Sequence, residues 1–220
     1  MTATAELIER TATGLHDCLI GIVESRVPDR GVRTLDIGCG TGAFLVRMHR
    51  AGYGELYGID YDPPVSLDEI DIRQFDLNKD QSASLGQFDL VLCIEVIEHV
   101  ENVGNLLDCI HAVLKPGGIA LVTTPNLESL HARIRGLLSG EFPHFDGKSD
   151  PTHLMPILSA SLEKMLARRA MKIDELLAYP ADARESVMFS SKIRRLRNFT
   201  AGVLKDPVPG DNTIYVIRHG

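Results

Sequence analysis

The 220-residue sequence predicts a single α/β domain, built on a doubly wound, mostly parallel sheet of seven strands with helices on both faces. Three observations support this prediction. Short apolar runs alternate with segments of helical periodicity, which is typical of parallel strands joined by crossover helices. A glycine-rich turn separates the first strand from the next helix, as in sheets that bind ligands at strand ends. An apolar content of 44% and a net charge of −7 are ordinary for a chain with one buried core.

The predicted elements follow one another in a regular order. Apolar residues at helical spacing predict an N-terminal helix within residues 1–28, ended by Pro28 and Gly31. The expected strands are 34–37, 56–60, 70–75, 88–93, 119–124, 171–178 and 213–218. The later helices are expected at 43–51, 103–114, 159–169 and 186–204. Residues 125–156 interrupt this rhythm, and a connection of that length predicts a substrate-side insert or lid.

Composition also restricts the compartment and the partners. The 30 acidic residues outnumber the 23 Lys and Arg, which disfavours a protein that coats nucleic acid. The four cysteines lack metal-site spacing and are expected to be reduced thiols, mostly in the core. The first ten residues lack a signal-peptide pattern, and no stretch has the roughly 18 apolar residues of a membrane span. These features predict a soluble cytoplasmic protein and leave its oligomeric state open.

One short segment, residues 192–203, is strongly basic. Its predicted helix is amphipathic and carries a charge of +4, so the rest of the chain carries −11. Such a helix is suited to a membrane surface or an anionic acceptor, although solvated helices that pack on a sheet have the same pattern. Its four basic residues are Lys192, Arg194, Arg195 and Arg197.

The glycine-rich turn, residues 36–42, is the first segment that indicates chemistry. At the carboxyl end of a parallel strand, glycines allow a tight turn and close approach of a ligand, and the next helix offers free N–H groups. The second strand ends in Asp60, 22 residues after Gly38. An acid at that place is suited to binding both hydroxyls of a ribose and would repel a 2′-phosphate. The pair predicts an adenosine-type cofactor other than NADP.

With further motifs, these segments resemble class I S-adenosylmethionine-dependent methyltransferases. The motifs are Leu35–Gly42, Tyr57–Asp60, Phe75–Leu77, Phe88–Val100 and Leu114–Gly118. The resemblance implies a Rossmann-like sheet, S-adenosyl-L-methionine as cofactor and direct in-line methyl transfer to an aligned acceptor. In motif style the chain is similar to ubiquinone-biosynthesis and bacterial glycan-pathway O-methyltransferases. The cofactor-binding residues that it implies are Asp36, Gly38, Cys39, Gly40, Thr41, Gly42, Asp60, Tyr61, Asp76, Leu77, Ile94 and Glu95.

A Glu-x-x-Glu-His run follows the fourth strand. Glu95, Glu98 and His99 have the spacing of one face of a helical turn, near the expected transfer site. Ubiquinone-pathway and small-RNA methyltransferases have a similar run that binds a divalent ion, so the resemblance implies a metal site for an ion such as Mg²⁺. That site would include Glu95, Glu98, His99 and His153. Two alternatives stay open. In the first, the site is metal-free, His99 and His153 are catalytic, and His153 acts as a general base. In the second, His153 has no direct role.

The leading prediction is O-methylation of a small or glycan-like acceptor. Asn126, the long insert and the run Asp150–His153 resemble bacterial glycan- and quinone-pathway enzymes, and the insert's His131 and His144 suit a polar acceptor that must lose a proton. An alternative is an RNA 2′-O-methyltransferase, which the net charge opposes; residues 154–156 also lack the aromatic, basic stretch of those enzymes. A non-catalytic S-adenosylmethionine-binding partner subunit and a dehydrogenase are further alternatives.

Overall fold

The computed structural model describes residues 8–63, 70–77, 79, 82–182 and 208–220. The first seven residues of the expected N-terminal helix lie outside this part of the chain. So does the basic segment 192–203, and with it the predicted membrane or acceptor contact. Within the described ranges, no helix is both long and apolar enough to cross a membrane.

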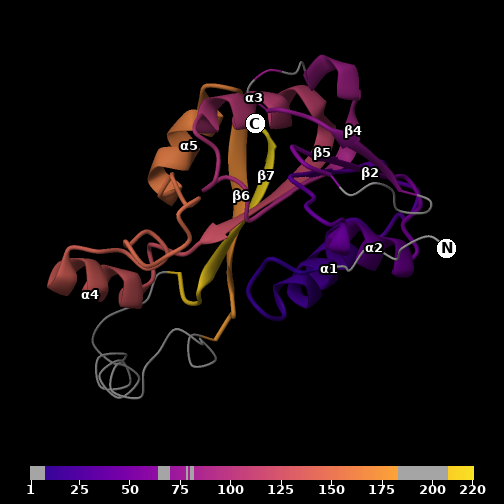
Figure 1. Cartoon of the computed structure of the whole chain (residues 1–220). Helices are drawn as coiled ribbons and strands as arrows, with labels where there is room; N and C mark the ends of the chain where they lie inside the picture. The colour runs from indigo at the N-terminus through magenta and orange to yellow at the C-terminus, as the bar shows by residue number, and fades with distance from the viewer. Residues whose placement is uncertain (1–7, 64–69, 78, 80–81, 183–207) are drawn as a thin grey trace.

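Seven strands form one sheet in the order β3-β2-β1-β4-β5-β7-β6 (Figure 1). Neighbouring strands pair in parallel except at β7, which runs antiparallel to both β5 and β6. The predicted mostly parallel, seven-stranded sheet is therefore confirmed. The strands are β1 Thr34–Ile37, β2 Leu56–Asp60, β3 Asp71–Gln74, β4 Phe88–Ile94, β5 Leu114–Pro125, β6 Met171–Tyr179 and β7 Asn212–His219. Because chain order reverses between β1 and β4, their carboxyl ends leave a crevice of the kind in which such sheets bind ligands.

Helices cover both faces of the sheet, as predicted. The helices are α1 Leu15–Arg26, α2 Ala43–Arg50, α3 Val103–Val113, α4 Leu130–Ser139 and α5 Ser159–Ala167, with a short 3-10 turn, η1, at Ser82–Leu85. Buried residues of α1 and α2 pack on one face, and those of α3 and α5 pack on the other. Helix α4 lies apart from the sheet, within the insert (Figure 1).

Strand β4 shows how one strand serves both cores. Leu90 and Leu92 pack with α1 and α2, whereas Val91 and Cys93 pack with α3. Successive side chains of a strand point to opposite faces, so a continuous apolar run is what a strand covered on both sides needs. All four cysteines are free thiols, and three of them are buried, as expected.

Two expectations about the elements are wrong. The N-terminal helix begins only at Leu15, because Gly14 has a left-handed backbone and residue Ile8 exchanges hydrogen bonds with the Thr41 hydroxyl across the glycine-rich turn. Strand β5 begins at Leu114, earlier than expected, because the Lys-Pro-Gly-Gly stretch runs on as strand after a register shift beside β4. The insert also contains α4, whose N-terminus is capped by the Ser129 hydroxyl.

Candidate active site

A cavity of about 960 Å³ opens at the carboxyl ends of β1, β2 and β4. The glycine-rich turn, the segment after β4, the insert and residues 8–13 form its wall. Gly42 does not line it and instead caps α2 with φ 76°. The structure thus brings most of the predicted site residues to one cavity: Asp36, Gly38, Cys39, Gly40, Thr41, Asp60, Tyr61, Asp76, Leu77, Ile94, Glu95, Glu98, His99 and His153.

The glycine-rich turn is closed against β2 and against the segment after β4. The amides of Gly38 and Cys39 both donate to the Ile59 carbonyl, at 2.7 and 3.1 Å. Gly38 has φ +73°, and a Cβ there would lie 2.5 Å from Cγ2 of Val96. Only glycine fits this position without a shift of its neighbour. Gly38 therefore lets the turn pack directly against the segment after β4.

Two carboxylates stand on either side of this turn. Asp60 accepts hydrogen bonds from the amides of Gly40 at 2.8 Å and Asp62 at 3.0 Å. Asp36 is 3% exposed, and its Oδ1 has no hydrogen-bond partner among the described residues. Burial, together with the charge of Asp60, raises the pKa of Asp36 to about 7. A buried acceptor without a partner is costly, so this cradle fits a ligand that brings a cationic group or hydroxyls, as S-adenosylmethionine does.

Glu95 directly follows β4, which ends at Ile94, and has a positive φ of 53°. Its carboxylate accepts from the Thr123 hydroxyl and from the Asn212 amide, both at 2.7 Å. Burial raises its pKa to about 7, against the opposing effect of those hydrogen bonds. The expected helical turn from Glu95 to His99 is absent, because only residues 97–99 form a turn and Glu95 lies before it.

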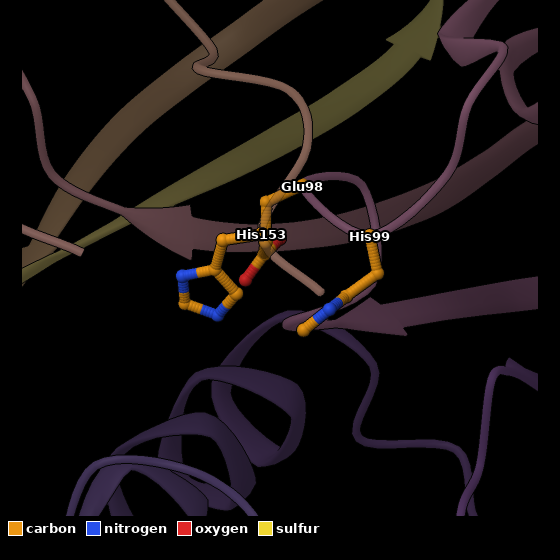
Figure 2. A group of neighbouring side chains, drawn as sticks. All are labelled: Glu98, His99 and His153. Carbon is orange, nitrogen blue, oxygen red and sulfur yellow. The ribbon is translucent and has the colours of Figure 1, made fainter. Parts of the chain in front are cut away.

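Glu98, His99 and His153 instead form a compact cluster (Figure 2). One potential ligand atom from each lies within 4.8 Å of the others. Glu98 is fully buried, and neither carboxylate oxygen has a hydrogen-bond partner in the described part of the chain. Burial, and secondarily the charge of Glu95, raises the pKa of Glu98 well above its usual value. Such a carboxyl group needs either a proton or a cation beside it.

The insert delivers His153 to this cluster through its backbone. The Glu98 carbonyl accepts hydrogen bonds from the amides of Leu154 at 2.8 Å and Met155 at 3.0 Å. These bonds fix the residue just before them, His153, beside Glu98. Main-chain contacts thus bring together His99 and His153, which are 54 positions apart in the sequence.

Both imidazoles have their protons fixed by carbonyl acceptors. Nδ1 of His99 lies 3.1 Å from the Thr152 carbonyl, and Nδ1 of His153 lies 2.9 Å from the His144 carbonyl. A carbonyl only accepts, so each Nδ1 carries the proton and each Nε2 keeps a free lone pair. The Thr152 hydroxyl also contacts His99 while it donates to Asp150 at 2.6 Å. This arrangement is the usual outer support of metal-binding or basic histidines.

Several residues that line the cavity are not predicted by any sequence motif. Asn212, at the start of β7, holds Glu95, and its own Oδ1 is buried without a partner among the described residues. His16 lines the cavity, with its Nδ1 3.4 Å from Oε1 of Glu9, and packs edge-on against Phe44. No sequence motif predicts that Asn212 lies at the cavity, because its position there depends on the pairing of β7 with β5. Its position in the polar run just before the last strand was the only available signal.

The fold and the site together define the class of protein. A mostly parallel sheet with a glycine-rich turn after β1 and an acid at the end of β2 is the arrangement of a nucleoside-cofactor site. Residues 8–176 match the family described as Methyltransferase domain, and the chain belongs to this family.

Curated relatives and solved structures agree with this membership. The ubiquinone biosynthesis O-methyltransferase of Pseudomonas aeruginosa (strain LESB58) is 30% identical over 125 residues, which cover 51% of this chain and 53% of the relative. The chain thus spans about half the length of the curated relatives it matches. A SAM-dependent methyltransferase from Archaeoglobus fulgidus superposes with a TM-score of 0.58 at 19% identity, covering 92% of this chain and 93% of that one. The magnesium protoporphyrin IX methyltransferase of Synechocystis PCC 6803, solved with bound SAH, gives 0.58 at 16% identity, covering 93% and 82%. The two structures support the fold.

Proposed function

We propose that the protein is an S-adenosylmethionine-dependent O-methyltransferase that acts on a small or glycan-like acceptor. The observation that carries this proposal is the single cavity shared by the glycine-rich turn, the two acids beside it and the Glu98–His99–His153 cluster. S-adenosylmethionine supplies an already activated methyl group, so the chain needs no nucleophile of its own. Its task is to hold and align the two reactants. The names of the curated relatives favour oxygen as the methyl acceptor.

Each part of the cofactor has residues suited to it. Asp60 is suited to accept from both ribose hydroxyls, and Asp36 to face the cationic amino-acid end. Asp76 and Leu77 would flank the adenine, while Gly38 would let the turn that holds the cofactor pack against Val96. Gly40, Thr41, Cys39, Tyr61, Ile94 and Glu95 would complete the wall.

Thermal shift with S-adenosylhomocysteine tests cofactor choice. Ligand at 100 times its dissociation constant adds about 2.7 kcal/mol to the stability of the folded state, so we expect a clear rise in Tm. Asp60→Asn removes a charged acceptor and should weaken binding about tenfold or more. The matched control, Asp62→Asn, changes the exposed acid two residues along and should bind normally. A shift with NAD alone would contradict the proposal.

The cluster is proposed to hold a divalent ion. One carboxylate and two imidazole nitrogens suit Mn²⁺ or Zn²⁺, and with water ligands Mg²⁺. The bound ion would lower the pKa of an acceptor hydroxyl. Glu98, His99 and His153 are the proposed protein ligands, because one potential ligand atom of each lies within 4.8 Å of the others and neither Glu98 oxygen has a partner among the described residues. Glu95 is left out of the set, because the cluster of mutually close ligand atoms contains only the other three residues, and Thr123 and Asn212 hold the Glu95 carboxylate.

Calorimetric titration with Mn²⁺, in the presence of S-adenosylhomocysteine, tests the ion site. Glu98→Gln should abolish binding, whereas the control Glu101→Gln, an exposed acid three residues along, should leave it intact. If the unmutated protein binds no ion, the metal proposal is wrong. The cluster would then act as a metal-free site with His153 Nε2 as the general base. In that case, His153→Ala should lower turnover with little change in cofactor affinity.

A further inference from the structure

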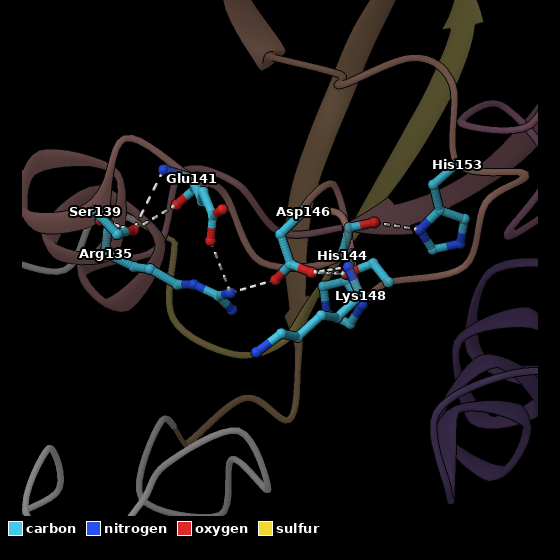
Figure 3. A network of polar contacts seen from close by, with 8 residues as sticks. Arg135, Ser139, Glu141, His144, Asp146, Lys148 and His153 are labelled. Atoms are coloured by element: carbon cyan, nitrogen blue, oxygen red, sulfur yellow. Dashed lines mark hydrogen bonds and ion pairs between the residues drawn. The ribbon is translucent and has the colours of Figure 1, made fainter.

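An ion pair within the insert, outside the cavity wall, is linked to His153 through the loop that carries His144. Arg135 of α4 bonds to the Asp146 carboxylate, and Figure 3 shows this pair together with the contact between the His144 carbonyl and His153. Glu141 lies farther off, 4.0 Å from Arg135. The pair lies outside the cavity wall, so no direct contact with a reactant explains it.

Asp146 organises the loop on which His144 lies. Its Oδ1 accepts from the Lys148 amide at 2.8 Å and from the Ser149 hydroxyl at 3.1 Å. Its carbonyl accepts from the Ser149 amide at 3.0 Å. These bonds close residues 146–149 into a turn around one carboxylate. Arg135 then fastens that turn to α4, which keeps the loop at a fixed distance from the helix.

The loop in turn aims one carbonyl at His153. His144 has a positive φ of 65°, a backbone conformation that a residue with a side chain adopts only when its surroundings impose it. In this conformation its carbonyl accepts from Nδ1 of His153 at 2.9 Å. The ring of Phe145 also packs against His153, with centroids 5.5 Å apart. The position of the His144 carbonyl therefore depends on how the loop is held.

We infer that Arg135 and Asp146 are positioning residues for His153. Their ion pair holds the loop so that the His144 carbonyl keeps the proton on Nδ1 and leaves the Nε2 lone pair for the Glu98–His99 cluster. The consequence for turnover or ion binding rests on the proposed function. The position of the proton does not, since it follows from the loop alone.

Nitrogen NMR of the imidazoles tests the inference without any acceptor. In the unmutated protein we expect His153 as the Nδ1–H tautomer, with its signal assigned by its loss in His153→Gln. Arg135→Gln should populate the Nε2–H tautomer or broaden the signal. Asp146→Asn should do the same, because it keeps the Oδ1 acceptor of the turn and removes the charge. Arg133→Gln, an exposed arginine on the same helix, is the matched control and should leave the signal unchanged.

A double variant and a second readout separate positioning from a loss of folding. If the two residues act as a pair, the double variant Arg135→Gln with Asp146→Asn should change the His153 tautomer no more than either change alone. Arg135→Lys should restore part of the Nδ1–H signal of His153. Mn²⁺ affinity or kcat should fall about tenfold, the scale of lost outer-shell support, while S-adenosylhomocysteine affinity stays within about twofold. An unchanged tautomer in both single variants would overturn the inference, even if methyl transfer is confirmed. If the tautomer changes in the variants but the unmutated protein transfers no methyl group, the inference is supported and the proposed function is refuted.

Discussion

At the scale of single residues, Asp36 shows how the site is kept ready for a ligand at some cost to the fold. The side chain is buried at the end of β1, one oxygen lacks a partner among the described residues, and Asp60 lies close enough to add repulsion. Both effects disfavour the carboxylate and favour its protonated form. Below about pH 7 the folded protein therefore keeps a proton on Asp36, whereas the unfolded chain releases that proton near pH 3.8.

This difference predicts how stability depends on pH. The pKa of Asp36 is about 7 in the folded protein against 3.8 as the reference value, so the stabilisation is fully present below pH 4 and is lost as pH rises through 7. This difference in pKa, about three pH units, corresponds to about 4 kcal/mol of unfolding free energy. We expect Asp36→Asn, which cannot ionise, to lose less unfolding free energy between pH 5 and 8 than the unmutated protein does. Urea unfolding without ligand measures this, and equal slopes in the two proteins would rule out Asp36 as the source.

The same scale shows what the residues alone could predict. Asp36, Gly38 and Asp60 all line the cavity, and their place could be predicted because each belongs to a local motif whose geometry follows from the strand, turn and helix. Glu95 was wrongly grouped with Glu98 and His99, since spacing along a sequence cannot show that the chain turns after Val96. Asn212 could not be foreseen, because its contact with Glu95 joins β7 to the end of β4.

At the scale of elements, Asn126 fastens the end of β5 to the segment before β7. Its side-chain amide donates to the carbonyls of Val208 at 2.8 Å and Gly210 at 3.0 Å. Its Oδ1 accepts from the amides of Glu128 and Ser129, at 2.9 and 3.1 Å. One buried side chain therefore satisfies four backbone groups that no strand pairing reaches. It also fixes the start of β7, where Asn212 faces the cavity.

Asn126→Ala should be among the costly polar substitutions in this chain. It leaves several buried backbone groups without partners, and each unsatisfied group costs about 1–3 kcal/mol. We expect a loss of at least about 2 kcal/mol in urea unfolding, with an unchanged m value. Asn102→Ala, which removes the N-cap of α3, is the comparison and should cost about 1 kcal/mol. A smaller loss from Asn126→Ala than from Asn102→Ala would show that water replaces the missing contacts.

At the scale of the whole molecule, the sheet divides the apolar interior into two cores. One contains α1 and α2, the other α3 and α5, and the sheet lies between them. Substitutions on opposite faces share no partner and lie a full sheet apart. Their energetic effects should therefore be independent.

A double-mutant cycle tests this independence. Leu45→Ala on α2 should cost about 2–5 kcal/mol, and Ile110→Val on α3 about 0.5–1.5 kcal/mol. The double variant should equal their sum within about 0.5 kcal/mol. The matched pair Leu107→Ala with Ile110→Val, three residues apart on α3, should depart from additivity because both side chains lie in the same core. Strong coupling across the sheet would contradict two separate cores.

The sequence by itself determined the sheet, the helices that cover it, the glycine-rich turn and the acid at the end of β2. These features follow from hydrophobic periodicity and local turn chemistry, which act over a few residues. Only the tertiary structure decided that residues 8–14 cross the turn, that β5 begins at Leu114, and that His153 joins Glu98 and His99 while Glu95 does not. Those outcomes depend on hydrogen bonds between segments far apart in the chain, above all the bonds from Leu154 and Met155 to the Glu98 carbonyl. The partners in such bonds are set by how packed elements meet, which spacing along the sequence does not record.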